Sequence, residues 1–118
     1  MKRFLAIYTG SMEAFERAGW NALEPATRQA REAAGMKAWM DWGTAHADRI
    51  VDQGAPLGRT KRAAPEGIAD FRNTMTGYVI VEAESHDEAA RMFENHPHFT
   101  LFPGEAVEIM ECLPMPGG

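Results

Sequence analysis

The chain has 118 residues, 45% of them hydrophobic and 25% charged, so we expect a single globular domain over residues 1–118 with one core. The formal net charge of −5 argues against nucleic acid as a general partner, because such binding depends on lysine and arginine side chains that neutralise phosphates. No apolar stretch is long enough to cross a bilayer, so no membrane partner is expected. The single cysteine, Cys112, excludes an internal disulfide and favours a cytoplasmic location.

The first strand is expected at Lys2–Thr9, where both faces of the segment are largely apolar. The short run Tyr78–Val81 has the same two-sided pattern. A sheet that is covered on one side only should alternate between apolar and polar residues. The pattern therefore predicts helices over one face of the sheet and a second sheet or another subunit over the other.

Two helices are expected between these strands, a short one over Met12–Leu23 and a longer one over about Pro25–Asp48, because proline suits the first turn of a helix. The second half of the longer helix carries one apolar face, which comprises Met36, Trp39, Met40, Gly43 and Ala47. Trp42 and His46 lie along the flank of this face. Core packing is the main expectation for Trp39, whereas Trp42 and His46 could also form one wall of a ligand pocket.

A hairpin excursion is expected after the longer helix. Ile50–Gly58 leads through a short strand into two weak arms, Arg59–Arg62 and Gly67–Phe71, around Pro65-Glu66. Basic residues commonly protect an exposed strand edge, and this is the main interpretation of the basic arm. The alternative is that Arg59, Lys61 or Arg72 binds an anionic group.

The clearest local pattern is a strand that runs into a helix. After Tyr78–Val81, Ser85 and Glu88 have the spacing of a capping box, in which the serine hydroxyl accepts the backbone N–H three residues on and the glutamate reaches back. The helix is therefore expected to begin at His86 and to stop at Pro97. Its buried side should comprise Ala89, Met92 and Phe93.

The rest of the chain is expected to form a turn and loop over His96–Phe102, a last strand over about Glu105–Leu113, and a flexible tail over 113–118. The complete order is strand, helix in two pieces, strand, hairpin, strand, helix, strand. This order predicts an α+β fold with a ferredoxin-like antiparallel sheet and helices on one face.

Six short segments, spread over nearly the whole chain, carry a resemblance to a known family: Arg3–Tyr8, Gly54–Gly58, Thr76–Ala83, Ser85–Ala90, His96–His98 and Val107–Ile109. They resemble the YCII-related or DGPF domain proteins, which belong to the dimeric α/β-barrel group. The resemblance implies a ferredoxin-like subunit whose open sheet face packs on a second copy, and hence a homodimer.

Members of the wider family have been proposed as enzymes because of a histidine in the first helix and an aspartate after the second. Counted from Gly54, Lys37–Trp39 stands near the histidine position of this chain and His96 near the aspartate position. The pair is not evident here, and the motif that names the DGPF domain is reduced to Asp70-Phe71. The resemblance therefore supplies no mechanism.

Histidines are the candidate acid/base groups, because histidine titrates near neutrality without help from its surroundings. We expect His46 or His96 to be the catalytic base; the alternative for His46 is a half-buried helix residue that bonds a backbone carbonyl. His96 and His98 lack a third ligand with recognised metal spacing, so no metal is expected, and no cofactor is expected either.

Two functions remain open. The first is a small-molecule enzyme that uses histidine acid/base chemistry in an apolar cleft on a small anionic or aromatic ligand. The ligand-binding residues would then be Trp39, Trp42, Arg59, Arg72, Tyr78 and His98. The second is a noncatalytic ligand-binding or dimerisation module with a regulatory accessory role.

Overall fold

A computed structural model describes residues 1–116. In chain order the elements are β1 (Lys2–Thr9), α1 (Met12–Ala18), the 3₁₀ helix η1 (Trp20–Ala22), α2 (Pro25–Ala45), β2 (Ile50–Pro56), β3 (Thr60–Ala64), β4 (Gly67–Phe71), β5 (Met75–Ala83), α3 (His86–Arg91), α4 (Pro97–Thr100) and β6 (Ala106–Glu111). The predicted flexible tail over 113–118 lies in part outside the described residues.

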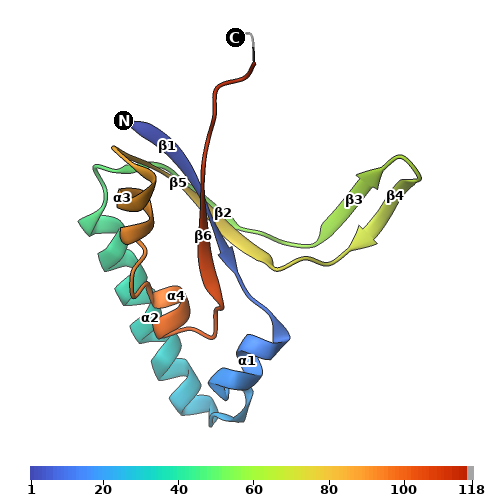
Figure 1. Ribbon diagram of the computed structural model, residues 1–118. Helices are drawn as coiled ribbons and strands as arrows, with labels where there is room; N and C mark the ends of the chain where they lie inside the picture. Colours follow the sequence, from blue (N-terminus) through green and yellow to red (C-terminus); the bar gives the residue numbers. More distant parts are fainter. Residues whose placement is uncertain (117–118) are drawn as a thin grey trace.

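Four strands form one antiparallel sheet in the order β2-β5-β1-β6, with β1 paired to both β5 and β6. The helices α2, α3 and α4 lie on one side of this sheet (Figure 1). The core beneath them contains Phe4, Ala6, Val79 and Val81, all nearly inaccessible to solvent. The predicted α+β, ferredoxin-like architecture is therefore confirmed.

The face of the sheet away from these helices is also apolar. Leu5 and Ile7 of β1 pair with Ile80 and Tyr78 of β5, and all four residues are only half-buried. Their neighbours along each strand, such as Phe4 and Val79, point to the helices and are buried. The two-sided apolar pattern of these strands thus corresponds to one covered face and one accessible face within a single chain.

The first helical segment is shorter than predicted. The Ser11 hydroxyl accepts the Ala14 N–H at 3.1 Å and caps α1. Gly19 adopts a left-handed backbone conformation, with φ of 65°, and ends the helix after seven residues. A single 3₁₀ turn, η1, then carries the buried Trp20. Pro25 begins α2 as expected.

The predicted apolar face of α2, which comprises Met36, Trp39, Met40, Gly43 and Ala47, lines a cavity on the sheet side of the helix and is not closely packed. Met36 and Met40 are 56% and 69% exposed, whereas Gly35 is the buried residue of the helix. The ring of Phe102 occupies the space that a side chain at position 35 would need. The glycine lets α2 approach this ring closely, and Trp39 and Trp42 consequently turn toward the core.

The strand–helix unit around Ser85 forms largely as predicted. The Ser85 hydroxyl accepts the Glu88 N–H at 3.1 Å, and the Glu88 carboxylate reaches back to the N–H of Glu84 at 3.1 Å. Ala89 and Phe93 are buried, and Met92 is half-buried against the same core. The helix itself ends at Arg91, before the predicted stop.

The predicted loop over His96–Phe102 is instead the short helix α4. Pro97 occupies its first turn, and the ring nitrogen Nδ1 of His96 accepts the N–H of His98 at 3.0 Å. A buried histidine thus takes the capping role that serine or aspartate usually has. Because histidine is not a usual capping residue, the sequence pattern did not indicate this helix.

The predicted hairpin is confirmed as β3 and β4, which form a separate two-stranded sheet with Pro65-Glu66 as its turn. Figure 1 shows it as an arm that extends away from the four-stranded sheet. Ion pairing between Lys61 and Asp70 at 2.7 Å links its two strands. The arm is accessible along most of its length, and Ile68 is 76% exposed.

Candidate functional site

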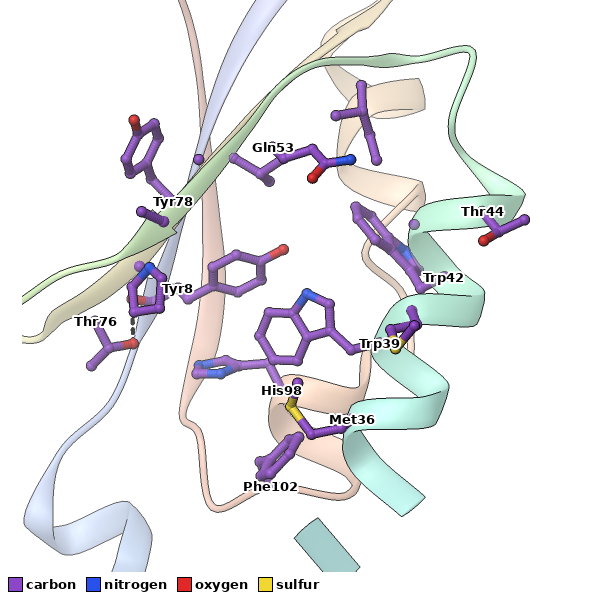
Figure 2. Close-up of a pocket in the computed structure, with 18 of the residues that line it drawn as sticks. Tyr8, Met36, Trp39, Trp42, Thr44, Gln53, Thr76, Tyr78, His98 and Phe102 are labelled. Carbon is purple, nitrogen blue, oxygen red and sulfur yellow. Dashed lines mark hydrogen bonds between the residues drawn. The ribbon is translucent and has the colours of Figure 1, made fainter. Parts of the chain in front are cut away.

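A cavity of about 820 Å³ lies between α2 and the helix-covered side of the sheet. Its walls come from α2, from the paired strands β1, β2 and β5, and from α4 and the chain that follows it; they include Tyr8, Met36, Trp39, Met40, Trp42, Gln53, Thr76, Tyr78, His98 and Phe102 (Figure 2). Among the described residues, no lysine, arginine, aspartate or glutamate lines it. The site is therefore apolar and aromatic, with a few uncharged hydrogen-bonding groups.

Tyr8 joins the cavity to the core. Its position in the central strand β1 places the ring 4.8 Å from Trp39 and 5.2 Å from both His96 and His98, measured between ring centroids. Burial raises the pKa of Tyr8 well above its ordinary value, so the phenol stays protonated. Its hydroxyl is consequently a neutral donor and acceptor at the cavity wall.

His96 lies behind Tyr8 and is completely buried. Because its Nδ1 accepts the N–H of His98, the proton of the neutral ring is on Nε2, which lies 3.5 Å from the Tyr8 hydroxyl. Burial is the main cause that lowers the pKa of His96 from 6.5 to about 4, and the charges of His98 and His46 act in the same direction. His96 is therefore a neutral structural group near pH 7.

His98 differs from His96 because it lines the cavity. Its Nε2 lies 2.7 Å from the carbonyl oxygen of Thr9, which can only accept a hydrogen bond, so Nε2 carries the proton and Nδ1 keeps a lone pair. Burial lowers the pKa of His98, while the bond to Thr9 opposes this effect. Nδ1 has no hydrogen-bond partner among the described residues, so it is the basic nitrogen of a ring that is 8% exposed.

The two tryptophans of α2 have different roles. The indole N–H of Trp42 donates to the carbonyl of Met92 at 2.7 Å, which ties α2 to the end of α3. The indole N–H of Trp39 makes no hydrogen bond with the described residues, and Figure 2 shows it directed into the same space as the Tyr8 hydroxyl. Trp39 therefore offers a free donor to a bound molecule.

The structure brings together four of the predicted ligand-binding residues, because Trp39, Trp42, Tyr78 and His98 all contribute to the lining. The strand register, however, pairs Tyr78 with Ile7, so the Tyr78 ring points to the open side of the sheet, away from the Tyr8 ring (Figure 2). Its contribution to the cavity is the backbone and the base of the side chain.

The other predicted site residues lie elsewhere. His46 is at the end of α2, where its Nδ1 bonds the carbonyl of Trp42 at 2.9 Å, and it does not line the cavity. His96 is shielded by Tyr8 and Trp39. Arg59 and Arg72 are exposed where the arm begins and ends, and neither belongs to the cavity wall. The anion-binding arrangement is therefore not assembled in the cavity.

Two positions singled out by spacing do meet. The rings of Trp39 and His96, which stand near the histidine and aspartate positions of the resembled family, lie 4.6 Å apart in an edge-to-face arrangement. Sequence reasoning missed Gln53 and Phe102 as lining residues. No local sequence pattern indicates either residue. Gln53 lines the cavity because the strand β2 is irregular, and Phe102 because it contacts Gly35.

Within residues 1–116, no group of three histidine, cysteine, aspartate or glutamate side chains is arranged to hold a metal ion. No helix in the described part of the chain has the length and apolarity that crossing a membrane requires.

No family model matches the chain, and no curated protein matches it either. Among solved structures, it is similar to 5-chloro-2-hydroxyhydroquinone dehydrochlorinase (TftG) from Burkholderia phenoliruptrix, in complex with 2,5-dihydroxybenzoquinone. The TM-score is 0.51 at 19% sequence identity, over 92% of this chain and 90% of that one. The chain thus shares the α+β fold of that structure. At this identity the similarity concerns the fold.

Proposed function

We propose that this protein is a small-molecule enzyme, related to the YCII-related proteins, that binds an uncharged oxygenated ring in the cavity and moves a proton with His98. The observation that carries the proposal is the combination of an aromatic, uncharged wall with one cavity-lining imidazole whose Nδ1 has no hydrogen-bond partner among the described residues. A cavity of about 820 Å³ is within the usual range for small-ligand sites.

The wall chemistry selects the ligand class. Aromatic side chains favour a flat ring, and the absence of charged residues among the described lining disfavours an anion, which would lose its hydration without a partner. The hydroxyl of Tyr8 and the indole N–H of Trp39 suit oxygen substituents on such a ring. That the structural neighbour TftG binds a dihydroxybenzoquinone supports an oxygenated ring, in place of the anionic ligand that the sequence left open.

Among the histidines, we assign the base to His98 rather than to His46 or His96, because His98 alone of the three lines the cavity. Its Nδ1 would take the proton of a ring hydroxyl, and the electron pair of the broken O–H bond would stay on the ring oxygen. The Nε2–H bond to Thr9 would stabilise the imidazolium, while Trp39 would donate to the phenolate. A lowered pKa keeps His98 neutral, and so ready to accept a proton, near pH 7.

Deuterium exchange into the ring of 1,2,4-trihydroxybenzene tests the proton transfer. In D₂O without oxygen, the phenolate gains a deuteron at a ring carbon and then loses the original proton from that carbon, which ¹H NMR follows. We expect the wild type to accelerate the exchange. His98→Gln keeps an N–H that can donate to the Thr9 carbonyl but has no basic nitrogen, and it should slow the exchange about 100-fold. The control His86→Gln, at an exposed position, should leave the exchange rate unchanged.

The noncatalytic alternative has one observation in its favour: apart from two tyrosines, His98 is the only acid/base group of the described lining, so a second catalytic group is missing. If the protein is a binding module, His98→Gln and His86→Gln should bind the ring with wild-type affinity. Neither the wild type nor His98→Gln would then accelerate the exchange. Binding without acceleration would therefore refute the enzymatic proposal and leave a ligand-binding function.

We further propose that the chain forms a homodimer through the open face of the sheet and acts in the cytoplasm. Support comes from the half-buried Leu5, Ile7 and Ile80, which form an apolar surface on that face, and from the free, exposed Cys112. Light scattering should give twice the 13.1 kDa of one chain. A mass of one chain at micromolar concentration would refute the dimer.

A further inference from the structure

The strand β2 is irregular beside the cavity. Asp52 pairs with Ile80 and Ala55 pairs with Tyr78, so two residues of β2, Gln53 and Gly54, lie opposite the single residue Val79 of β5. This is a β-bulge, a feature that re-aims a side chain and interrupts the regular ladder. Since Val79 faces the helices, Gln53 falls on the cavity side of the sheet.

Two neighbouring residues fix the bulge. The Asp52 carboxylate accepts the backbone N–H of Gly54 at 2.8 Å, and Gly54 has a φ of 68°, a conformation that glycine adopts without strain. A side chain at position 54 would overlap the carbonyl of Tyr78. The local sequence therefore determines the backbone on which Gln53 is presented.

The Gln53 side chain is unused by the fold. It is an exposed residue that lines the cavity, and its amide makes no hydrogen bond with the described residues. Figure 2 shows it reaching into the cavity at the end opposite His98 and Phe102. An amide carries both donors and an acceptor, so it can bond a hydroxyl or a carbonyl oxygen.

We infer that Gln53 is a specificity-determining residue that recognises an oxygen substituent on the far edge of the bound ring. The inference rests on the proposed function, and it narrows the ligand to rings with oxygen substituents on opposite edges. One substituent lies at the end formed by Tyr8, Trp39 and His98, and the other meets the amide of Gln53.

Calorimetric titration with two ligands of nearly equal shape tests this assignment. Hydroquinone has hydroxyls on opposite edges, whereas 4-methylphenol replaces one of them with a methyl group. In Gln53→Met, the affinity for hydroquinone relative to 4-methylphenol should fall about fivefold, the usual worth of one neutral hydrogen bond. The matched control Gln29→Met changes an exposed residue of α2 outside the cavity and should keep the wild-type ratio.

A second variant, Asp52→Ala, removes the bond that holds the bulge and should lower the same ratio in part, with little change in affinity for 4-methylphenol. If Gln53→Met retains the wild-type ratio, the role of Gln53 is refuted while ring binding stands. If the wild type binds neither ring, the proposed function fails and this inference fails with it.

Discussion

Replacement of His96 by asparagine should remove much of the acid sensitivity of the fold. The buried ring has a pKa of about 4 in the folded chain, against 6.5 ordinarily. Between these two pH values the unfolded chain binds more protons than the folded chain. The contribution of neutral His96 to the free energy of unfolding is therefore fully present above pH 6.5 and is lost as the pH falls toward 4. Because one pKa unit corresponds to about 1.4 kcal/mol, the loss attributable to His96 is about 3 kcal/mol.

Asparagine is the appropriate substitute because its side-chain oxygen can still accept the N–H of His98, as Nδ1 of His96 does now. The smaller side chain leaves a void that lowers stability at every pH, so the informative quantity is the change with pH. Burial lowers the pKa of His98 as well, and the variant should therefore keep part of the slope.

Urea unfolding followed by tryptophan fluorescence at several pH values between 7.5 and 4.5 measures the effect. Wild type and His86→Asn, which changes an exposed histidine, should lose stability in parallel over this range. His96→Asn should lose distinctly less. An equally steep loss in His96→Asn would show that His96 is not buried in its neutral form, and the account of the Tyr8–His96 contact would have to be abandoned.

Two further substitutions test the close contacts of glycine. Gly35→Ala should lower the free energy of unfolding by about 1–3 kcal/mol, because the added methyl group meets the Phe102 ring. Gly43→Ala lies on the same helix with open space around it, and it should raise the free energy of unfolding by up to about 1 kcal/mol. Equal effects of the two substitutions in urea unfolding would contradict the contact between Gly35 and Phe102. Gly54→Ala should lower the free energy by at least about 1 kcal/mol through backbone strain and overlap with Tyr78, and unchanged stability would show that the bulge is not fixed as described.

Local patterns sufficed to predict the elements that depend on neighbouring residues. The Ser85 cap and the buried side of α3 follow from a spacing of three or four residues, and the structure contains both. The two-sided apolar strands likewise predicted a cover over each face of the sheet; the structure has helices over one face and an apolar, half-buried surface on the other.

The features that could not be predicted depend on residues distant in the sequence. The burial of Gly35 results from its contact with Phe102, which is distant in the sequence. Tyr8 and His96 are 88 positions apart and meet only in the folded chain. The His96 cap of α4 likewise depends on the burial of His96 in the folded chain. From the sequence alone, three histidines were equivalent candidates for the base, whereas the structure shows that His96 is buried in the core and His98 lines the cavity.

The arm formed by β3 and β4 has a consequence for how this chain can change. Its two ends leave the main sheet side by side, where the N–H of Leu57 donates to the carbonyl of Thr76 at 2.9 Å, and its strands pair only with each other. Mutations within the arm therefore leave the packing beneath α2 untouched. Selection can reshape this projecting surface, or shorten it to a tight turn, at a rate independent of the one that preserves the cavity.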